Sequence, residues 1–221
     1  MKFKPTKNKS KPKFEEVLNK RFDWRGHFMV PEVESQKCAN CWAYAVLGVY
    51  DWVSRITENP KPWDGSGQFV VSNSKAGDCK GVNRFLASEF LQKFGVMEEF
   101  KYPDTVTNGT HEKSLKNLHP DFPPIYMFGS ISKQEAPDVE DIYICEGLVS
   151  AATNATDAFK NYVEGVLDEG ANKSTDHAVI IIGWNDSKQA WIIQNSWGTN
   201  WRITVDYGNK KDMRMSNTDL T

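Results

Sequence analysis

The chain has 221 residues, enough for one large domain or for two small lobes around a shared core. Apolar residues make up 39% and charged residues 25%, as in ordinary globular domains, and the net charge of −2 gives no reason to expect nucleic acid or a membrane surface as the partner. No apolar run approaches the roughly 18 residues that a membrane span needs.

The chain begins with a lysine-rich segment. Six lysines lie between Met1 and Lys13, and no apolar stretch follows them, so the segment lacks the middle region of a secretory signal. Like charges with few apolar residues repel one another, and we therefore expect residues 1–21 to form a disordered basic tail. The folded part is expected to cover residues 22–221.

The first predicted helix runs from Cys41 to about Thr57. Apolar side chains recur there every three or four residues, which is typical of a helix with one buried face. Asn40 stands at the N-cap position, and Asn59 and Pro60 follow the last turn. Cys41 is therefore expected at the beginning of a helix.

Two more helices are predicted before the last third of the chain. One covers about Val82–Phe94 and ends at Gly95, because glycine readily adopts the left-handed conformation that terminates helices. Another begins near Pro137, a favoured first helical residue, and continues to about Tyr143.

The last third of the chain reads as strands, with a turn at 185–188. The predicted strands are 148–152, 178–184, 190–196 and 203–207. Helices in the first half and strands in the second indicate an α+β protein of two lobes, with the boundary near 122–126, where prolines cluster.

The turn at 185–188 suggests which side chains face each other. A tight hairpin with Trp184 opposite Lys188 places His177 directly across from Asn195, with Cβ atoms about 4.5–5.5 Å apart. An asparagine oxygen in that position can accept a proton from one imidazole nitrogen and leave the other nitrogen facing a nucleophile.

Cys41 is the candidate nucleophile. At a helix N-terminus, unpaired backbone N–H groups and the helix dipole favour an anion. A protonated histidine nearby would lower the pKa of the thiol further and make the reactive thiolate the main form.

Four stretches together resemble the papain family of cysteine proteases, which includes the cathepsins. They are Gln36 with CANCWAY at 38–44, DHA at 176–178 with GW at 183–184, NSWGTNW at 195–201, and FDWR at 22–25. His177 and Asn195 follow Cys41 at about the family's usual separation of roughly 130–150 residues. The resemblance covers about residues 21–207.

The resemblance implies a role for each matching residue. Cys41 attacks the scissile carbonyl as a thiolate, and His177 is its ion-pair partner and later protonates the leaving amine. Asn195 orients His177, and Trp197 covers that hydrogen bond. Gln36 and the backbone N–H of Cys41 form the oxyanion hole.

The resemblance also implies a disulfide and a substrate surface. Four cysteines alone allow two bridges, one bridge or none. The family pattern pairs Cys38 with Cys79, and it places Gly81 along the bound substrate. Ala152 and Ala178 would line the pocket for the second substrate side chain.

The implied fold is papain-like, with a helical left lobe, an antiparallel β-barrel-like right lobe and the active-site cleft between them. The helical lobe is expected at about 34–124, and the β lobe at about 125–221 together with 22–33. The expected partners are polypeptide substrates and a propeptide or protein inhibitor, with no cofactor, no metal, and a monomeric chain. A disulfide favours an oxidising compartment, which is secreted or similar to the lysosome or vacuole.

Three departures from the family pattern keep other functions open. Gln36 lies five residues before Cys41 where the family has six, Val82 stands where a second glycine is usual, and several residues are missing after Trp201. These motivate a papain-fold binding protein with weakened catalysis. The spacing of Cys38 and Cys41 is also compatible with thiol–disulfide exchange, although that function leaves the histidine and asparagine motifs unused.

Overall fold

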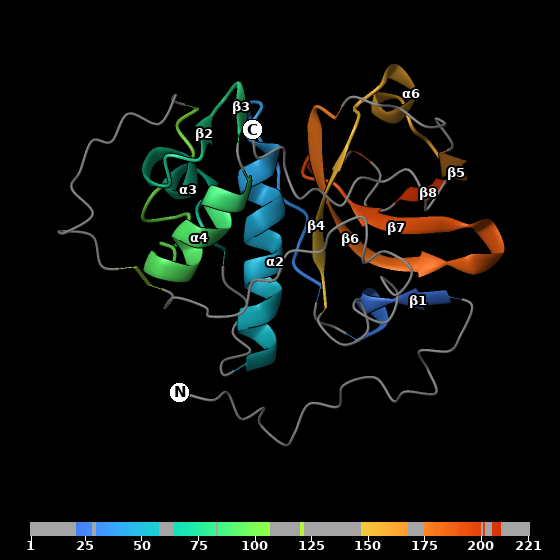
Figure 1. Cartoon of the computed structure of the whole chain (residues 1–221), viewed down its shortest axis with the longest axis horizontal. Coiled ribbons are helices and arrows are strands. Elements are labelled where there is room, and N and C mark those ends of the chain that lie inside the picture. The colour runs from blue at the N-terminus through green and yellow to red at the C-terminus, as the bar shows by residue number, and fades with distance from the viewer. Residues whose placement is uncertain are drawn as a thin grey trace.

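A computed structural model describes residues 21–27, 30–57, 64–82, 84–106, 120–121, 147–167, 175–199, 201 and 205–208. Helices gather in one half of the molecule and strands in the other (Figure 1). The helical elements are η1 (Trp24–His27), α2 (Cys41–Thr57), α3 (Gly67–Asn73), α4 (Arg84–Phe94), α6 (Asp157–Lys160) and η4 (Asp186–Lys188). The strands are β1 (Arg21–Asp23), β2 (Gly77–Asp78), β3 (Gly81–Val82), β4 (Val149–Thr153), β5 (Val166–Leu167), β6 (His177–Asn185), β7 (Ala190–Gln194) and β8 (Val205–Gly208).

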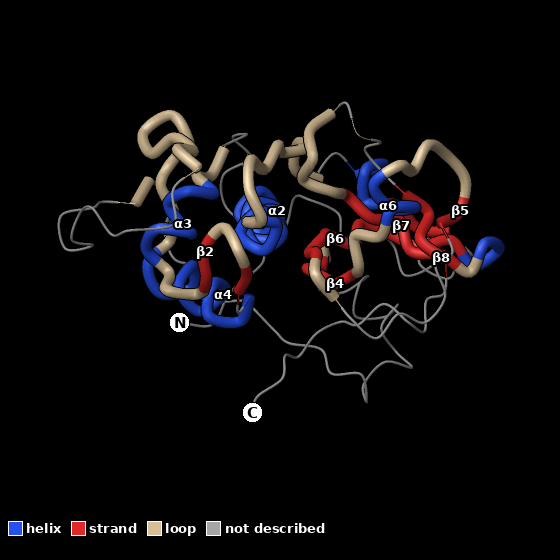
Figure 2. The backbone as a smooth tube through the Cα atoms, turned by 90° about the horizontal axis from the view of Figure 1, so that it is seen from above, coloured by secondary structure: helices blue, strands red, loops and turns tan. Residues whose placement is uncertain are grey.

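The helix α2 lies at the border between the two halves (Figure 2). It contacts α3 and α4 in the helical half and β4 and β6 in the other half, and every residue from Cys41 to Leu47 is buried. The predicted helix, with Asn40 directly before its first residue, is confirmed. The side-chain oxygen of Asn40 accepts no hydrogen bond, and its backbone oxygen accepts one from Ala43 N (2.9 Å).

One mixed sheet forms the second half, with the strand order β1-β6-β7-β8-β5 and with β4 also paired to β6. Only the short pair β5 and β8 is parallel among the described strand pairs. The strand β6 is long enough to pair with β4 near its beginning and with β1 near its end. The predicted α+β class, with helices and an antiparallel sheet in separate halves, is confirmed.

The hairpin between β6 and β7 has a different register from the tight turn expected. Trp184 pairs with Trp191 and Asn185 with Ala190, so Lys188 lies in the turn rather than opposite Trp184. The turn is longer because its residues form a 3-10 helix that begins with Asn185 Oδ1 accepting from Lys188 N (3.3 Å).

The register changes once more inside the hairpin, between Ile181 and Gly183. Because β7 ends at Gln194, Asn195 lies beyond the paired residues. The expectation that His177 and Asn195 oppose each other as paired strand residues is therefore wrong, although their side chains do meet, as described below.

The other predicted elements agree with the structure within about two residues where it describes them. The second helix begins at Arg84, and Gly95 ends it with a φ of 73°. The helix expected at 137–143, the lobe boundary at 122–126 and the tail up to residue 20 lie outside the described residues, and β1 begins at Arg21. No helix in the described ranges is long and apolar enough to cross a membrane.

Gly183 allows β1 to lie close to β6, and we expect its replacement by alanine to lower the free energy of unfolding by about 1–3 kcal/mol. A Cβ there would lie 2.2 Å from Phe22 O and 3.0 Å from Asp23 Cα, which are backbone atoms that cannot rotate away. At Gly26 an added Cβ meets nothing within 4 Å, so Gly26→Ala is the matched control, with an effect within about 0.5 kcal/mol. Urea unfolding measures both variants, and equal losses would contradict the close approach.

Candidate active site

Cys41 is the first residue of α2, and it takes no part in a disulfide. Its side chain is buried, with 7% of the residue exposed. The unpaired N–H groups and the positive end of the helix dipole at this position favour a thiolate over a thiol. The sequence-based placement of Cys41 at a helix start is confirmed.

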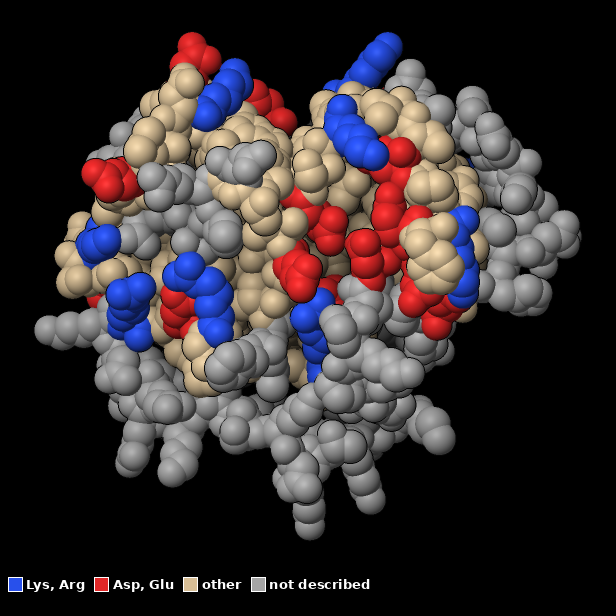
Figure 3. All heavy atoms as spheres, turned by 180° about the vertical axis from the view of Figure 1, so that it is seen from behind, with Lys and Arg blue, Asp and Glu red and all other residues tan. Residues whose placement is uncertain are grey.

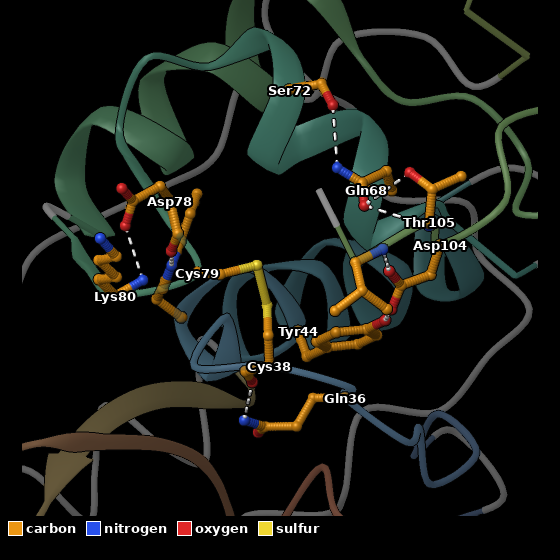
Figure 4. The surroundings of a disulfide bond; sticks show 12 residues. Gln36, Cys38, Tyr44, Gln68, Ser72, Asp78, Cys79, Lys80, Asp104 and Thr105 are labelled. Carbon is orange, nitrogen blue, oxygen red and sulfur yellow. Dashed lines mark hydrogen bonds between the residues drawn. A yellow bond between two sulfur atoms is a disulfide. The ribbon is translucent and has the colours of Figure 1, made fainter. Parts of the chain in front are cut away.

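The disulfide between Cys38 and Cys79 joins the segment before α2 to the turn between β2 and β3 (Figure 4). The indole nitrogen of Trp42 donates to Asp78 O (3.1 Å) in the same hairpin. Gly81, which begins β3, pairs with Asp78. The predicted disulfide is confirmed, and it holds the Gly81 hairpin against the beginning of α2.

Cys41 and His177 lie at the same end of the border between the two halves. A Cβ on Gly48 would lie 2.2 Å from Cδ1 of Ile180, so these two positions are in contact. Gly48 follows Cys41 by two turns of helix, about 10 Å, and Ile180 follows His177 by three residues of strand, also about 10 Å. Because α2 and β6 both begin at the upper end in Figure 1, their first residues lie at one level.

A buried hydrogen bond joins the two other predicted site residues. His177 Nε2 lies 2.7 Å from Asn195 Oδ1, and both residues are more than nine-tenths buried. The backbone N–H of Ser196 also donates to Asn195 Oδ1 (2.8 Å). A backbone N–H requires an acceptor, so this second bond identifies the amide oxygen and its orientation.

The bond to Asn195 determines the tautomer of His177. An amide oxygen only accepts, so Nε2 of the imidazole carries the proton. In the neutral ring the other nitrogen, Nδ1, then has a lone pair and can take a proton from a nucleophile. This is the arrangement that a general base requires.

Burial lowers the pKa of the His177 imidazole, while the hydrogen bond to Asn195 and the charge of Asp176 raise it. Asp176 is held in place because its Oδ1 accepts from Ala155 N (2.7 Å) and its backbone N–H donates to Thr153 O (3.1 Å). A negative charge on a neighbouring sulfur would act in the same direction as Asp176 and favour the imidazolium.

Aromatic rings cover His177. The ring of Trp197 lies 4.8 Å from the imidazole centroid, and that of Phe159, from α6, lies 5.6 Å away at 72°. Phe159 is fully buried and also meets Trp197 at 87°. Trp197 therefore lies against the imidazole, and its shielding role stays a prediction, whereas Phe159 belongs to no motif and was not predicted.

Gln36 is bonded to both sides of the site. Its Nε2 donates to Cys38 O (2.7 Å), as Figure 4 shows, and its Oε1 accepts from Ser196 Oγ (2.7 Å). Its backbone N–H donates to Ser196 O (2.8 Å). Ser196 thus links Gln36 to Asn195. Ser196 is part of the NSW motif, but nothing in the motif or its spacing predicted this contact with Gln36.

The two alanines expected near the substrate lie beside His177. Ala152 and Ala178 are both buried and form a pair between β4 and β6, next to the pair of Thr153 and His177. Within the ranges that the structure describes, no three His, Cys, Asp or Glu side chains are arranged to hold a metal ion.

Comparisons with known sequences agree with the motifs. The family described as Papain family cysteine protease matches residues 18–213. Vignain from Vigna mungo is 32% identical over 195 residues, which are 81% of this chain and 51% of that protein. Thiol protease SEN102 from Hemerocallis sp. is 28% identical over 197 residues, which are 81% of this chain and 51% of that protein. The chain thus spans about half the length of these relatives.

Comparisons with solved structures agree with the fold. The bromelain protease from Ananas comosus, solved in complex with the E64 inhibitor, has a TM-score of 0.72 at 25% identity and covers 87% of this chain and 91% of its own. The cysteine protease CMS1MS2 from Carica candamarcensis, in complex with E-64, has a TM-score of 0.74 at 21% identity. That match covers 91% of this chain and 92% of the solved chain. The papain-like fold predicted from the motifs is confirmed.

We expect His177 to titrate below 6.5 in a Cys41→Ala variant, and lower still when Asn195→Ala removes the bond that raises its pKa. The His177 imidazole then binds a proton more readily in the unfolded chain than in the folded chain. The free energy of unfolding therefore falls as the pH drops below about 6.5. NMR titration of the ring measures the pKa, and a His177→Gln variant assigns the resonance. A pKa at or above 6.5 in the Cys41→Ala protein would contradict the effect of burial.

Proposed function

The chain belongs to the papain family of cysteine proteases, and on that premise we propose that it hydrolyses peptide bonds through a thioacyl-enzyme formed at Cys41. The proposal rests most on the bond between His177 Nε2 and Asn195 Oδ1, at the same level as the beginning of α2. The site combines a candidate nucleophile, a base whose tautomer is determined, and the residue that orients the base.

In the proposed acylation, Cys41 gives its proton to His177 Nδ1 and attacks the carbonyl carbon of the substrate as a thiolate. The tetrahedral intermediate collapses when the C–N bond breaks, and the proton on Nδ1 goes to the leaving amine. Water then attacks the thioester, His177 takes one proton from it, and the C–S bond breaks to release the acid and the thiol. Throughout, Asn195 keeps the ring in place while Trp197 and Phe159 exclude water from their hydrogen bond.

Gln36 is the proposed side-chain donor to the oxyanion, together with the backbone N–H of Cys41. One of its two amide N–H bonds is used by Cys38 O, and the amide oxygen is held by Ser196 Oγ. The second N–H of this fixed amide is the one assigned to the oxyanion. The bonds to both lobes support this role despite the shortened spacing to Cys41.

The proposed substrates are polypeptides, which are the substrates that the family implies. Gly81 would lie along the substrate backbone, Trp197 would contact the leaving-group side, and the small side chains of Ala152 and Ala178 would leave room for an apolar residue. Regulation by a propeptide or a protein inhibitor, and a monomeric chain, remain predictions of the same resemblance.

The intact protein should react with E-64, an epoxysuccinyl inhibitor, at Cys41 and turn over a casein or peptide-library substrate. Mass spectrometry of the intact protein and of its peptides detects the adduct, and Cys41→Ala should lose both the adduct and the turnover. A folded, reduced protein that neither labels nor cleaves would refute hydrolysis. It would favour a papain-fold binding protein, the function that Val82 and the missing residues after Trp201 suggest.

Gln36→Ala should lower kcat by about 100- to 1,000-fold with little change in KM, because the lost donor binds a charge that develops only in the transition state. Steady-state kinetics on a peptide substrate measures both constants. Lys37→Ala, one residue further along the same segment, is the control and should stay near the parent values. A larger effect on KM than on kcat would assign Gln36 to substrate binding instead.

A further inference from the structure

Residues 31–36, here called the seam segment, lie beside the residues that follow β7. Two backbone hydrogen bonds and one bridge connect them. These are Gln36 N to Ser196 O (2.8 Å), Gly198 N to Glu34 O (2.8 Å) and the antiparallel bridge between Ser35 and Trp197. Residues 34–36 of the seam segment thus lie opposite residues 196–198, which directly follow Asn195.

The side chain of Gln194 makes a separate attachment to the beginning of the seam segment. Its Nε2 donates to Pro31 O (3.1 Å) and to Glu32 O (3.3 Å). A primary amide has two N–H groups, so these two carbonyl oxygens use both donors of Gln194. The seam segment is therefore bonded to a side chain at its beginning and to backbone groups at its end.

Gln194 belongs to the sheet and directly precedes Asn195. It is the last residue of β7 and pairs with Ile180 of β6. Gln194 is only 5% exposed, and Pro31 is buried as well, so water does not readily replace the bond between them. Loss of the amide donors would leave the carbonyl oxygen of Pro31 buried without this partner, which favours a shift of the seam segment.

The surroundings of the Gln194 amide are acidic. Gln194 lines a cavity together with Glu32, Glu34 and Asp51. Acidic side chains also gather where the two lobes meet on the face shown in Figure 3. Partial burial and the charges of neighbouring carboxylates raise the pKa of Glu34 to about 8. A neutral or cationic donor at position 194 is therefore compatible with this cavity, whereas an anion would be repelled.

We propose that Gln194 is a positioning residue, whose two hydrogen bonds to the seam segment keep Asn195 and the amide of Gln36 in the geometry that the reaction needs. The inference rests on the proposed roles of Gln36 and His177. Gln194 is joined to Asn195 by a peptide bond, and it is joined to Gln36 through the seam segment. It acts through these two residues rather than on the substrate.

The effect of Gln194 is expected on the chemical step because Ser196 lies between the two residues that it positions. The backbone oxygen and the hydroxyl group of Ser196 both bond to Gln36, and its N–H donates to Asn195 Oδ1. A shift of the seam segment would therefore move both the oxyanion donor and the residue that orients His177. A small misplacement of such groups lowers kcat, while KM depends on substrate contacts that remain.

The test compares kcat and KM of the wild type with those of Gln194→Met and Gln194→Lys. Methionine has a similar length and volume but no donor, so Gln194→Met should lower kcat about 10- to 100-fold and change KM less than about threefold. The ammonium group of Gln194→Lys can donate to the same two carbonyl oxygens and is attracted by the acidic cavity. This variant should therefore keep kcat within about threefold of the wild type.

Gln68→Met is the matched control because Gln68 is also a buried glutamine with a bonded amide. Its Nε2 donates to Ser72 Oγ (3.0 Å) within the helical lobe, and the residue is 2% exposed. Its kcat should stay within about threefold of the wild type. If Gln194→Met does not fold, Gln194→Asn replaces it, since its shorter amide cannot reach both carbonyl oxygens.

Three kinetic results would overturn the proposal. The first is an unchanged kcat in the variant that lacks the donors. The second is an equal loss in Gln68→Met, because general destabilisation would then explain the effect. The third is a loss in Gln194→Lys as large as that in Gln194→Met, because shape rather than hydrogen bonding would then be responsible.

Proton exchange at His177 provides a measurement that does not require peptide cleavage. In a Cys41→Ala background, NMR follows the exchange of the Nε2 proton, which is buried and bonded to Asn195 Oδ1. Adding Gln194→Met should accelerate this exchange at least about tenfold, whereas adding Gln68→Met should leave it unchanged. Faster exchange in a protein that shows neither E-64 labelling nor turnover would refute hydrolysis alone. Turnover with unchanged exchange and unchanged kcat in Gln194→Met would refute the role of Gln194.

Discussion

The buried hydrogen bond between His177 Nε2 and Asn195 Oδ1 constrains the rest of the site. It joins the first residue of β6 to the residue after β7, so it depends on the sheet being formed. The same oxygen accepts from Ser196 N, which determines the orientation of the amide and with it the tautomer of the imidazole. Loss of this bond would leave a buried imidazole N–H without a partner, which costs about 1–3 kcal/mol and lets the ring turn away from the sulfur.

In the proposed mechanism the reactive atoms are divided between two lobes, so the chemistry would depend on the interface as much as on either lobe. Cys41 is positioned by α2 and by the disulfide that joins Cys38 to the hairpin of Gly81. His177 is positioned by β6. Gln36 lies between them, and its amide bonds to Cys38 O on one side and to Ser196 Oγ on the other. A shift of one lobe against the other would therefore disturb Gln36, the proposed oxyanion donor, before it disturbed the histidine.

The sequence predicted those features that depend on local pattern or on a motif, and it missed those that depend on how segments meet. The period of apolar residues located α2, and the motifs located Cys41, His177, Asn195 and the disulfide. The register of the hairpin was wrong because a 3-10 turn and a shift after Ile181 replaced the tight turn. Phe159 lies between motifs, and its ring partners His177 and Trp197 belong to later segments of the chain, so it could not be identified without coordinates.

The buried His177 and the partly buried Glu34 respond to pH in opposite directions. The pKa of His177 is lowered, so its contribution to stability is lost as the pH falls below about 6.5. The pKa of Glu34 is raised, so its contribution is lost as the pH rises toward about 8. Above about 6.5 the contribution of His177 is complete while that of Glu34 is still being lost, and this difference favours the folded site on the acidic side of neutrality.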